Sequence, residues 1–266
     1  MNQPLVTLSI GAGVAELRLN RPDKRNALTR ALLQQAVQAV AKVAGDPAAR
    51  LLVVAAEGPV FCAGMDLAEM QQRAIQPDAK EQWAADARAY RDLLVALFEL
   101  SIPTLCVVQG AAVAGGVGLV AACDMVLASE AASFALPEPK RGITPAVVAP
   151  LLIYRIGPGA ATAMLLSCRT FSAEEALRTG FCHFLVPAAE IDARRRELCE
   201  SVLTGSPAAL ATTKQHIRSV TAEKLIAQLD ASMRVSAEAR ETADAREGLA
   251  AFLEKRDPSW LRRPSP

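Results

Sequence analysis

The sequence predicts an α/β layered fold, and three observations support this expectation. Residues 51–56 and 104–109 form short, almost wholly apolar runs, which are typical of strands covered on both faces. Each run leads through a turn into residues with helical spacing of apolar positions, and repeated strand–turn–helix units favour helices layered on a sheet. From about Pro145 onward, the chain is rich in alanine and mostly helical in pattern.

The N-terminal elements are predicted to be a hairpin followed by a helix. Residues 5–10 and 14–19 alternate apolar and polar positions around a turn at 11–13, which is the pattern of a hairpin with one solvated face. Thr29 can cap a helix whose apolar side chains recur at helical spacing until the Gly-Asp-Pro sequence at 45–47 ends it.

The middle of the chain repeats this arrangement. After the strand at 51–56, helical residues continue to Leu100, and the strand at 104–109 follows. A glycine-rich turn then leads into a helix at 119–122, and a third strand is expected at 124–128.

The C-terminal part is predicted to consist of helices. Residues 172–175, Ser-Ala-Glu-Glu, fit a helix-capping box, and residues 190–203, 207–220 and 223–253 each show an apolar stripe. These stripes exceed what one small domain needs to cover, which suggests packing on neighbouring subunits. Burial against the chain's own core is the alternative.

Composition narrows the function classes. The 266 residues carry a formal charge of +1, from 29 Lys and Arg against 28 Asp and Glu, so no global field attracts nucleic acid or an acidic membrane. No apolar stretch approaches the roughly 20 residues that cross a bilayer. Because no cationic start precedes an apolar block, we expect a cytoplasmic protein.

The cysteines and histidines favour acid–base chemistry carried by carboxylates. The six cysteines form no CxxC pair and are expected to be reduced, structural thiols. The two histidines, His183 and His216, lack zinc-type spacing, so no metal site is predicted. Their scarcity also disfavours a triad that needs a histidine base.

The first candidate motif is Phe-Cys-Ala-Gly-Met-Asp-Leu at residues 61–67, which follows a buried strand and opens a helix. Gly64 would let the backbone approach a ligand, and the helix N-terminus presents unpaired N–H groups to an anion. An ordinary strand-to-helix turn capped by Asp66 is the alternative.

The second motif is the glycine-rich segment 109–119, which again joins a buried strand to a helix. Its G-x-G-x-x-A pattern, with Glu138 downstream, imitates a dinucleotide fingerprint. However, Glu138 lies well beyond the strand that starts at Asp124, where a dinucleotide-binding acid is not expected. Close helix–strand packing remains the alternative for Gly116 and Gly118.

The third motif is the segment 137–145, in which two prolines fix the backbone around Glu138. A rigidly held acid beside apolar residues is how the pKa of a carboxyl is raised toward the working pH. A surface glutamate paired with Lys140 or Arg141 is the alternative.

In their order and spacing, these motifs make the sequence resemble the enoyl-CoA hydratase/isomerase, or crotonase, family. The resemblance runs from about residue 5 to 260 and rests on the segments 19–28, 61–67, 115–124, 134–142, 172–180 and 252–256. It implies a crotonase-like spiral of ββα units over residues 1–200 and a C-terminal helical trimerisation region over residues 201–266. It also implies a homotrimer or a dimer of trimers that acts on an acyl-CoA thioester, with no cofactor besides the coenzyme A of the substrate.

The resemblance assigns roles to individual residues. The backbone N–H groups of Met65 and Gly115 would form an oxyanion hole for the thioester enolate, and Glu138 would be the acid and base. Lys255 would reach a neighbouring subunit's bound CoA, although solvated charges are the alternative for Lys255 and the 24–25 loop. The residues that match substrate-binding positions are Lys24, Arg25, Ala27, Ala63, Asp66, Leu67, Gly116, Gly118, Arg141 and Lys255.

One departure from the family pattern bears on the reaction. Hydratases of the family carry two glutamates, and the first falls where this chain has Gly118. A site with one glutamate looks like the double-bond isomerases of the family. Yet the segment 142–150 resembles that of bacterial 3-methylglutaconyl-CoA and isohexenylglutaconyl-CoA hydratases, of leucine and terpene breakdown. We therefore expect hydration of a branched 3-substituted glutaconyl-CoA, with Gly118 enlarging the pocket.

Two alternative functions stay open, and the expected substrate requires a cation in its binding pocket. An isomerase that uses Glu138 is the nearest alternative, and a non-catalytic acyl-CoA-binding or RNA-binding member of the fold is another. The basic run at 194–196 points in three directions on a helix, which favours a solvated face over RNA binding. The distal carboxylate of a glutaconyl chain needs a cation, for which Lys140, Arg141 and Arg155 are the candidates.

Overall fold

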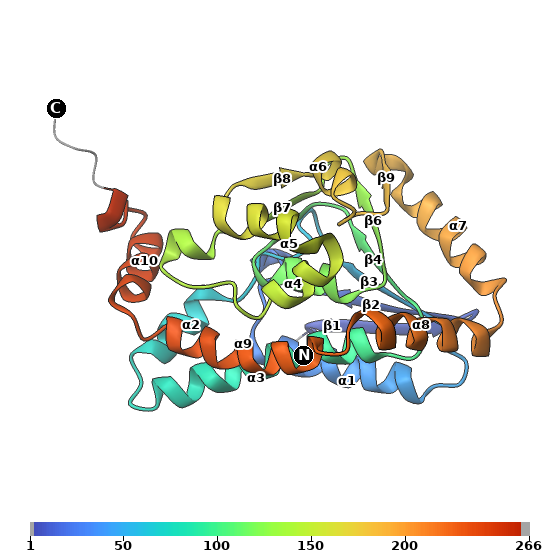
Figure 1. Cartoon of the computed structure of the whole chain (residues 1–266), viewed down its shortest axis with the longest axis horizontal. Coiled ribbons are helices and arrows are strands. Elements are labelled where there is room, and N and C mark those ends of the chain that lie inside the picture. Colours follow the sequence, from blue (N-terminus) through green and yellow to red (C-terminus); the bar gives the residue numbers. More distant parts are fainter. Residues whose placement is uncertain (1–2, 262–266) are drawn as a thin grey trace.

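The computed structural model describes residues 3–261 and places two sheets in the chain (Figure 1). In the larger sheet only β1 and β2 pair in antiparallel fashion. Its order is β1 (Val6–Gly11), β2 (Val14–Leu19), β3 (Leu51–Ala56), β4 (Thr104–Val108), β6 (Met125–Ser129) and β9 (Phe184–Val186). The smaller sheet is formed by β5 (Ala111–Val113), β7 (Ser133–Ala135) and β8 (Thr170–Ser172).

The first helices cover the larger sheet as the sequence predicts. Thr29 caps α1 (Arg30–Gly45) by accepting a hydrogen bond from the Leu32 N–H, and every residue of β3 is buried. Two helices, α2 (Leu67–Ala74) and α3 (Ala79–Glu99), lead to β4, and α3 packs against α1. The predicted α/β fold, hairpin and buried strands are therefore confirmed.

The glycine-rich segment after β4 differs from the expectation. Residues 111–113 form β5 and not a turn, and α4 (Gly115–Ala122) begins four residues earlier than predicted. The strand forms because β5 pairs with β7, a partner more than twenty residues away in the sequence. Every residue of α4 is buried, so this helix is the centre of the core.

The C-terminal half is mostly helical but includes two strands, β8 and β9, that the helical pattern did not predict. Ser172 and Glu175 form the predicted capping box of α6 (Ala173–Arg178). The stripe at 223–253 is divided into α9 (Leu225–Ala239) and α10 (Ala243–Leu253), because Thr242 caps a new helix by accepting a hydrogen bond from the Ala245 N–H.

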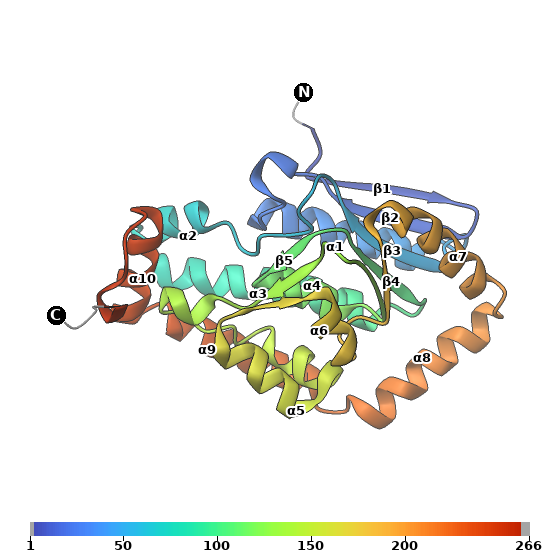
Figure 2. The same cartoon turned by 90° about the horizontal axis from the view of Figure 1, so that it is seen from above.

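The last helices lie at opposite ends of the molecule. Figures 1 and 2 place α7 (Ile191–Leu203) and α8 (Pro207–Thr221) at one end and α10 at the other, while α9 runs along α3. The predicted boundary at residue 200 stays a prediction, and α7 runs across it. Large apolar side chains remain exposed on these helices, among them Ile217, Val220, Val235 and Phe252.

Helix α5 (Ala149–Ser167) is the one helix within residues 3–261 that is long and apolar enough to cross a membrane, judged by length and composition alone. The sequence pattern did not predict a stretch of this kind. Gly157, with φ of 73°, interrupts the helical backbone and is followed by Pro158, so each half is far shorter than the roughly 20 residues that a bilayer needs.

Candidate active site

A cavity of about 540 Å³ gathers most of the predicted site residues. Its walls come from the loop before α1, the turns before α2 and α4, the short helix at Glu138–Arg141, the segment after it, and the helices α3, α9 and α10. Ten of the thirteen predicted residues line it: Lys24, Arg25, Ala27, Ala63, Met65, Asp66, Leu67, Gly115, Glu138 and Arg141.

Two turns meet in this cavity because Gly64 has no side chain. A β-carbon on Gly64 would lie 2.7 Å from the Ala114 β-carbon and 3.3 Å from the Gly115 nitrogen, so any other residue would force the turns apart. The backbone of Gly64, with φ of +87°, also favours glycine. The turns that carry Met65 and Gly115 are therefore in contact.

Each of the two turns leaves one backbone N–H, that of Met65 or of Gly115, outside the backbone hydrogen bonds around it. Leu28 donates to the Gly64 carbonyl and accepts from the Asp66 N–H, which leaves the Met65 N–H on the opposite side of that strand segment. Gly115 is the first residue of α4, where a helix supplies no partner for the N–H. Such a pair of donors can stabilise negative charge on one oxygen, and the α4 dipole adds to it.

Glu138 is a buried acid in the cavity wall. It begins the short helix that follows Pro137, and it is 8% exposed, with no hydrogen-bond partner for Oε2 within residues 3–261. Burial raises the pKa of Glu138 to about 7, although its own backbone N–H and the charge of Arg141 oppose the shift. A carboxyl that titrates near neutral pH can both take up and release a proton.

The hydroxyl of Tyr90, a residue that the sequence reasoning missed, lies where a side chain at position 118 would be. Tyr90 extends from α3 into the cavity wall and donates a hydrogen bond of 2.6 Å to the Gly115 carbonyl. A β-carbon on Gly118 would lie 2.0 Å from this hydroxyl. Gly118 does not line the cavity, so the expectation that it enlarges the pocket is wrong: Tyr90 fills that space.

Two further predicted residues lie outside the cavity lining. A β-carbon on Gly116 would lie 2.6 Å from the Cys62 carbonyl oxygen, so this glycine serves the close packing of α4 on the segment before Gly64 and not contact with a ligand. Lys255 is exposed beyond the end of α10. Its predicted contact with a neighbouring subunit's ligand stays a prediction.

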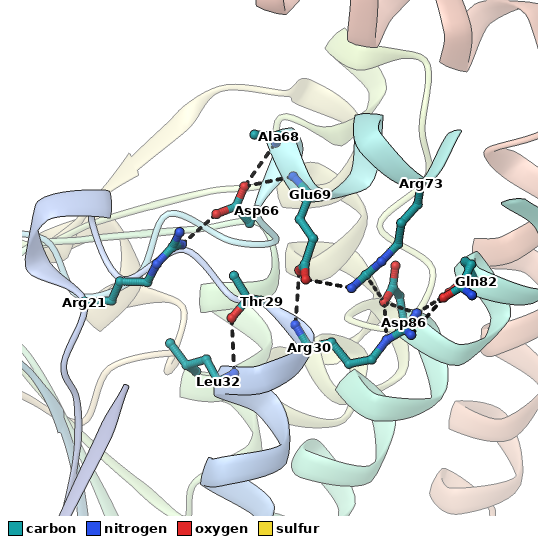
Figure 3. A network of polar contacts seen from close by, with 10 residues as sticks. All are labelled: Arg21, Thr29, Arg30, Leu32, Asp66, Ala68, Glu69, Arg73, Gln82 and Asp86. Atoms are coloured by element: carbon teal, nitrogen blue, oxygen red, sulfur yellow. Dashed lines mark hydrogen bonds and ion pairs between the residues drawn. The ribbon is translucent and has the colours of Figure 1, made fainter. Parts of the chain in front are cut away.

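Asp66 holds the entrance of α2 in place. Its carboxylate accepts hydrogen bonds of 3.1 Å from the Ala68 and Glu69 N–H groups and one of 2.6 Å from Arg21 (Figure 3). Burial alone would raise the pKa of Asp66, but these donors, with the Arg21 charge, hold it below its ordinary value. The alternative considered from the sequence, a helix cap, is therefore correct for the Asp66 side chain.

A charged cluster lies next to the cavity, and Figure 3 shows four of its members, Arg30, Arg73, Glu69 and Asp86. Its fifth member is Arg240, which lines the cavity together with Asp86. Asp86 is fully buried and pairs with Arg30 at 2.8 Å and with Arg73, while Arg73 also binds Glu69 at 2.6 Å. Arg240 is 8% exposed, and burial lowers its pKa, although the charge of Asp86 opposes the shift. Three arginines against two carboxylates leave one positive charge here.

Of the three cations proposed for a distal carboxylate, one lines the cavity. Arg141 does so, its guanidinium lies 4.3 Å from the centre of the Phe252 ring, and its Nε has no hydrogen-bond partner within residues 3–261. Lys140 is exposed and Arg155 donates to the carbonyls of Ala121 and Cys123, so neither is placed for this role.

Helix α10 fits tightly against the turn that carries Glu138 and Arg141. A β-carbon on Gly142 would lie 2.1 Å from the Asp244 carbonyl oxygen, and one on Gly248 would lie 2.3 Å from the Arg141 carbonyl carbon. The C-terminal helices therefore complete the cavity wall. Among the described residues, no group of three His, Cys, Asp or Glu side chains could hold a metal ion.

Comparison with known proteins relates this site to a family. Residues 9–263 match the family described as Enoyl-CoA hydratase/isomerase. The carnitinyl-CoA dehydratase of Proteus mirabilis is 34% identical, with 99% of this chain and 100% of that protein covered. The 2,3-dehydroadipyl-CoA hydratase of Escherichia coli K12 is 33% identical, with 93% and 94% covered.

The fold is also similar to that of solved structures. The crystal structure of an enoyl-CoA hydratase from Mycobacterium avium superposes with a TM-score of 0.87 at 33% identity, and 98% of this chain and 100% of that chain are covered. This match confirms the predicted crotonase-like α/β fold with C-terminal helices.

Proposed function

Because the chain belongs to the enoyl-CoA hydratase/isomerase family and is an enzyme of the lyase type that acts on acyl-CoA, we propose that it hydrates an enoyl-CoA whose acyl chain carries a second carboxylate. The observation that carries this proposal is Glu138, a buried acid with a pKa of about 7 and an unpartnered oxygen, in the same cavity as the Met65 and Gly115 N–H groups. This arrangement combines a proton carrier with donors for an oxyanion.

The oxyanion donors account for the activation of the thioester. When water adds to C3, the electron pair of the C2=C3 double bond moves toward the thioester oxygen and forms an enolate. The Met65 and Gly115 N–H groups stabilise that charge, and loss of one such donor typically costs about 2.7–4 kcal/mol of barrier.

Glu138 moves the proton. As carboxylate it accepts a proton from the attacking water, and as acid it returns the proton to C2 when the enolate collapses. The O–H bond of water breaks, C3–O and C2–H bonds form, and Glu138 ends in its starting state. A pKa of about 7 makes both directions of transfer feasible at neutral pH.

Coenzyme A is proposed to enter beside the loop before α1. Lys24 and Arg25 are exposed at the rim of the cavity, and Ala63, Asp66 and Leu67 line it beside them. In this proposal the two cations meet CoA phosphates, and the family role of Lys255 toward a neighbouring subunit applies in the assembled oligomer.

The second carboxylate of the acyl chain is proposed to bind Arg141, Arg240 or both. Each lines the cavity, and neither makes an ion pair with a carboxylate within residues 3–261. An unpaired anion in such a site would cost several kcal/mol, so these arginines suit a substrate that carries one. The Escherichia coli relative is named for 2,3-dehydroadipyl-CoA, whose acyl chain also ends in a carboxylate. A branched 3-substituted glutaconyl-CoA, either 3-methyl or isohexenyl, is our specific candidate.

Kinetics of Arg141→Met and Arg240→Met test this assignment. On a glutaconyl-type thioester, we expect KM to rise on the order of 10-fold or more, because an arginine–carboxylate contact of this kind is worth about 1.5–3 kcal/mol. On an uncharged enoyl-CoA of equal length, KM should change little. Lys140→Met is the matched control, since Lys140 is exposed outside the cavity. An equal rise of KM on both thioesters would show that these arginines do not bind the second carboxylate.

An isomerase remains the second candidate because Glu138 lines the cavity and position 118, where the first glutamate of the family pattern would stand, is a glycine. A product of unchanged mass with a moved double bond would identify that reaction. RNA binding is less favoured, since Arg194 pairs with Glu197 and Arg195 with Glu16. Salt-sensitive retention of RNA on a filter would detect it.

The proposed assembly is a homotrimer or a dimer of trimers. It is supported by the apolar side chains that α8, α9 and α10 leave exposed, including Ile217 and Val220 at 49% and 65% exposure. Light scattering at several protein concentrations would measure the mass, and a persistent monomer would contradict the proposal.

A further inference from the structure

The buried hydroxyl of Tyr90 has no role in a mechanism in which Glu138 is the only catalytic side chain. Its hydroxyl is buried in the cavity wall and occupies the volume that the first family glutamate would enter from position 118. In this chain, the Tyr90 hydroxyl from α3 therefore stands where the family pattern has a glutamate side chain from α4.

The hydrogen bond that Tyr90 already makes determines what its hydroxyl can do toward the cavity. A phenol has one O–H to donate, and Tyr90 donates it to the Gly115 carbonyl at 2.6 Å. Toward any other polar group, the oxygen can therefore only accept. Burial, reinforced by the nearby Cys62 and Glu138, raises the pKa of Tyr90 well above its usual value, so the phenol keeps its proton.

Glu138 supplies the second acceptor. Its Oε2 is buried without a hydrogen-bond partner within residues 3–261, and Glu138 and Tyr90 line the same cavity. A water molecule between two acceptors has both hydrogens bound and a lone pair free for attack. This is the arrangement that two carboxylates would otherwise provide.

We propose that the Tyr90 hydroxyl, through its free lone pairs, binds the water that attacks C3, and so replaces the glutamate missing at position 118. The inference rests on the proposed hydratase function. Tyr90 orients the water, and Glu138 alone takes its proton, so the balance of the reaction is unchanged.

Tyr90→Phe removes the hydroxyl and keeps the ring. We expect hydration to slow by about 10²-fold at little change in KM, because the water loses one of its two acceptors. Tyr154→Phe is the matched control, since it makes the same change at the chain's other tyrosine, whose hydroxyl lies 3.2 Å from the Thr221 hydroxyl.

A second reaction separates water binding from support of the Gly115 turn. Exchange of the C2 proton of a saturated acyl-CoA with D2O needs Glu138 and the oxyanion donors but no water addition. Tyr90→Phe should retain this exchange within a few-fold. If exchange falls as much as hydration, Tyr90 acts through the Gly115 backbone and the proposal is overturned; unchanged hydration overturns it as well.

Gly118→Ala gives an independent perturbation, since its β-carbon must displace the Tyr90 hydroxyl. It should slow hydration as Tyr90→Phe does, and the double variant should be no slower than either, because both remove the same contact. Additive losses would contradict the shared role.

The wild-type protein distinguishes a failure of this proposal from a failure of the proposed hydratase function. If it exchanges the C2 proton but adds no water to any thioester, the hydratase function itself is refuted. If it hydrates a thioester and Tyr90→Phe hydrates it equally fast, only the role of Tyr90 is refuted.

Discussion

Glu138→Gln should make the folded protein more stable at alkaline pH while it abolishes turnover. The folded structure raises the pKa of Glu138 from its ordinary value of 4.5 to about 7 because the carboxylate is buried. A raised pKa of an acid means that the folded state binds the proton more tightly than the unfolded chain does. The contribution of Glu138 to the free energy of unfolding is therefore fully present below about pH 4.5 and is lost as the pH rises through about 7.

The magnitude follows from this pKa difference. At about 1.4 kcal/mol for each pKa unit, burial of the charged form costs about 3 kcal/mol once the pH exceeds 7. Glutamine keeps the shape and carries no charge, so Glu138→Gln avoids this cost. We expect the variant to exceed wild type by about 3 kcal/mol at pH 8 and by less than about 1 kcal/mol at pH 5.

Urea unfolding at pH 5 and pH 8 measures both differences, at one fixed subunit concentration so that assembly does not alter the comparison. Glu174→Gln is a suitable control, because Glu174 is exposed in the first turn of α6 and does not line the cavity. A Glu138→Gln protein that is no more stable than wild type at pH 8, or whose advantage is equal at both pH values, would refute the reasoning.

Two further substitutions test the walls of the site. Gly115→Val should lose most activity, because even a β-carbon there would lie 3.3 Å from Leu28 and 3.4 Å from the Tyr90 ring, beside the proposed oxyanion donor. A folded variant with full turnover would remove Gly115 from that role. Asp86→Asn should lower the free energy of unfolding by about 3–5 kcal/mol, since it leaves the half-buried Arg30 and Arg73 without their fully buried carboxylate. The urea midpoint reports this loss, and an equal loss in Glu69→Gln, at the more exposed edge of the same cluster, would show that burial of Asp86 is not the cause.

Local patterns predicted those parts of the fold that local physics determines. The hairpin, the Thr29 cap, the buried strand β3 and the capping box at Ser172 each depend on residues within one element or its end. Strand β5 could not be predicted in this way, because its alanines and valine pair with β7 far along the chain. The division between α9 and α10 did have a local signal, Thr242, which caps the second helix.

The candidate site shows the same limit. Glu138, Met65 and Gly115 belong to motifs whose order carries the family resemblance, and the structure brings them to one cavity. Tyr90 occupies an apolar position of a long helix and reads as a core residue in the sequence. Its role depends on the contact with Gly118, which arises only when α3 packs against α4. Asp86 likewise reads as a surface charge, and only the packing of its arginine partners reveals its burial.

The most direct test of the hydratase assignment is the mass of the product. Wild-type protein and Glu138→Gln are incubated separately with 3-methylglutaconyl-CoA, isohexenylglutaconyl-CoA and a straight-chain enoyl-CoA, and the thioesters are weighed by mass spectrometry. We predict that wild type adds one water to a glutaconyl-type thioester in preference to the uncharged chain, and that Glu138→Gln forms this product at least about 10²-fold more slowly. Unchanged mass of all three thioesters with wild type, or a moved double bond without a gain of water, would contradict the assignment.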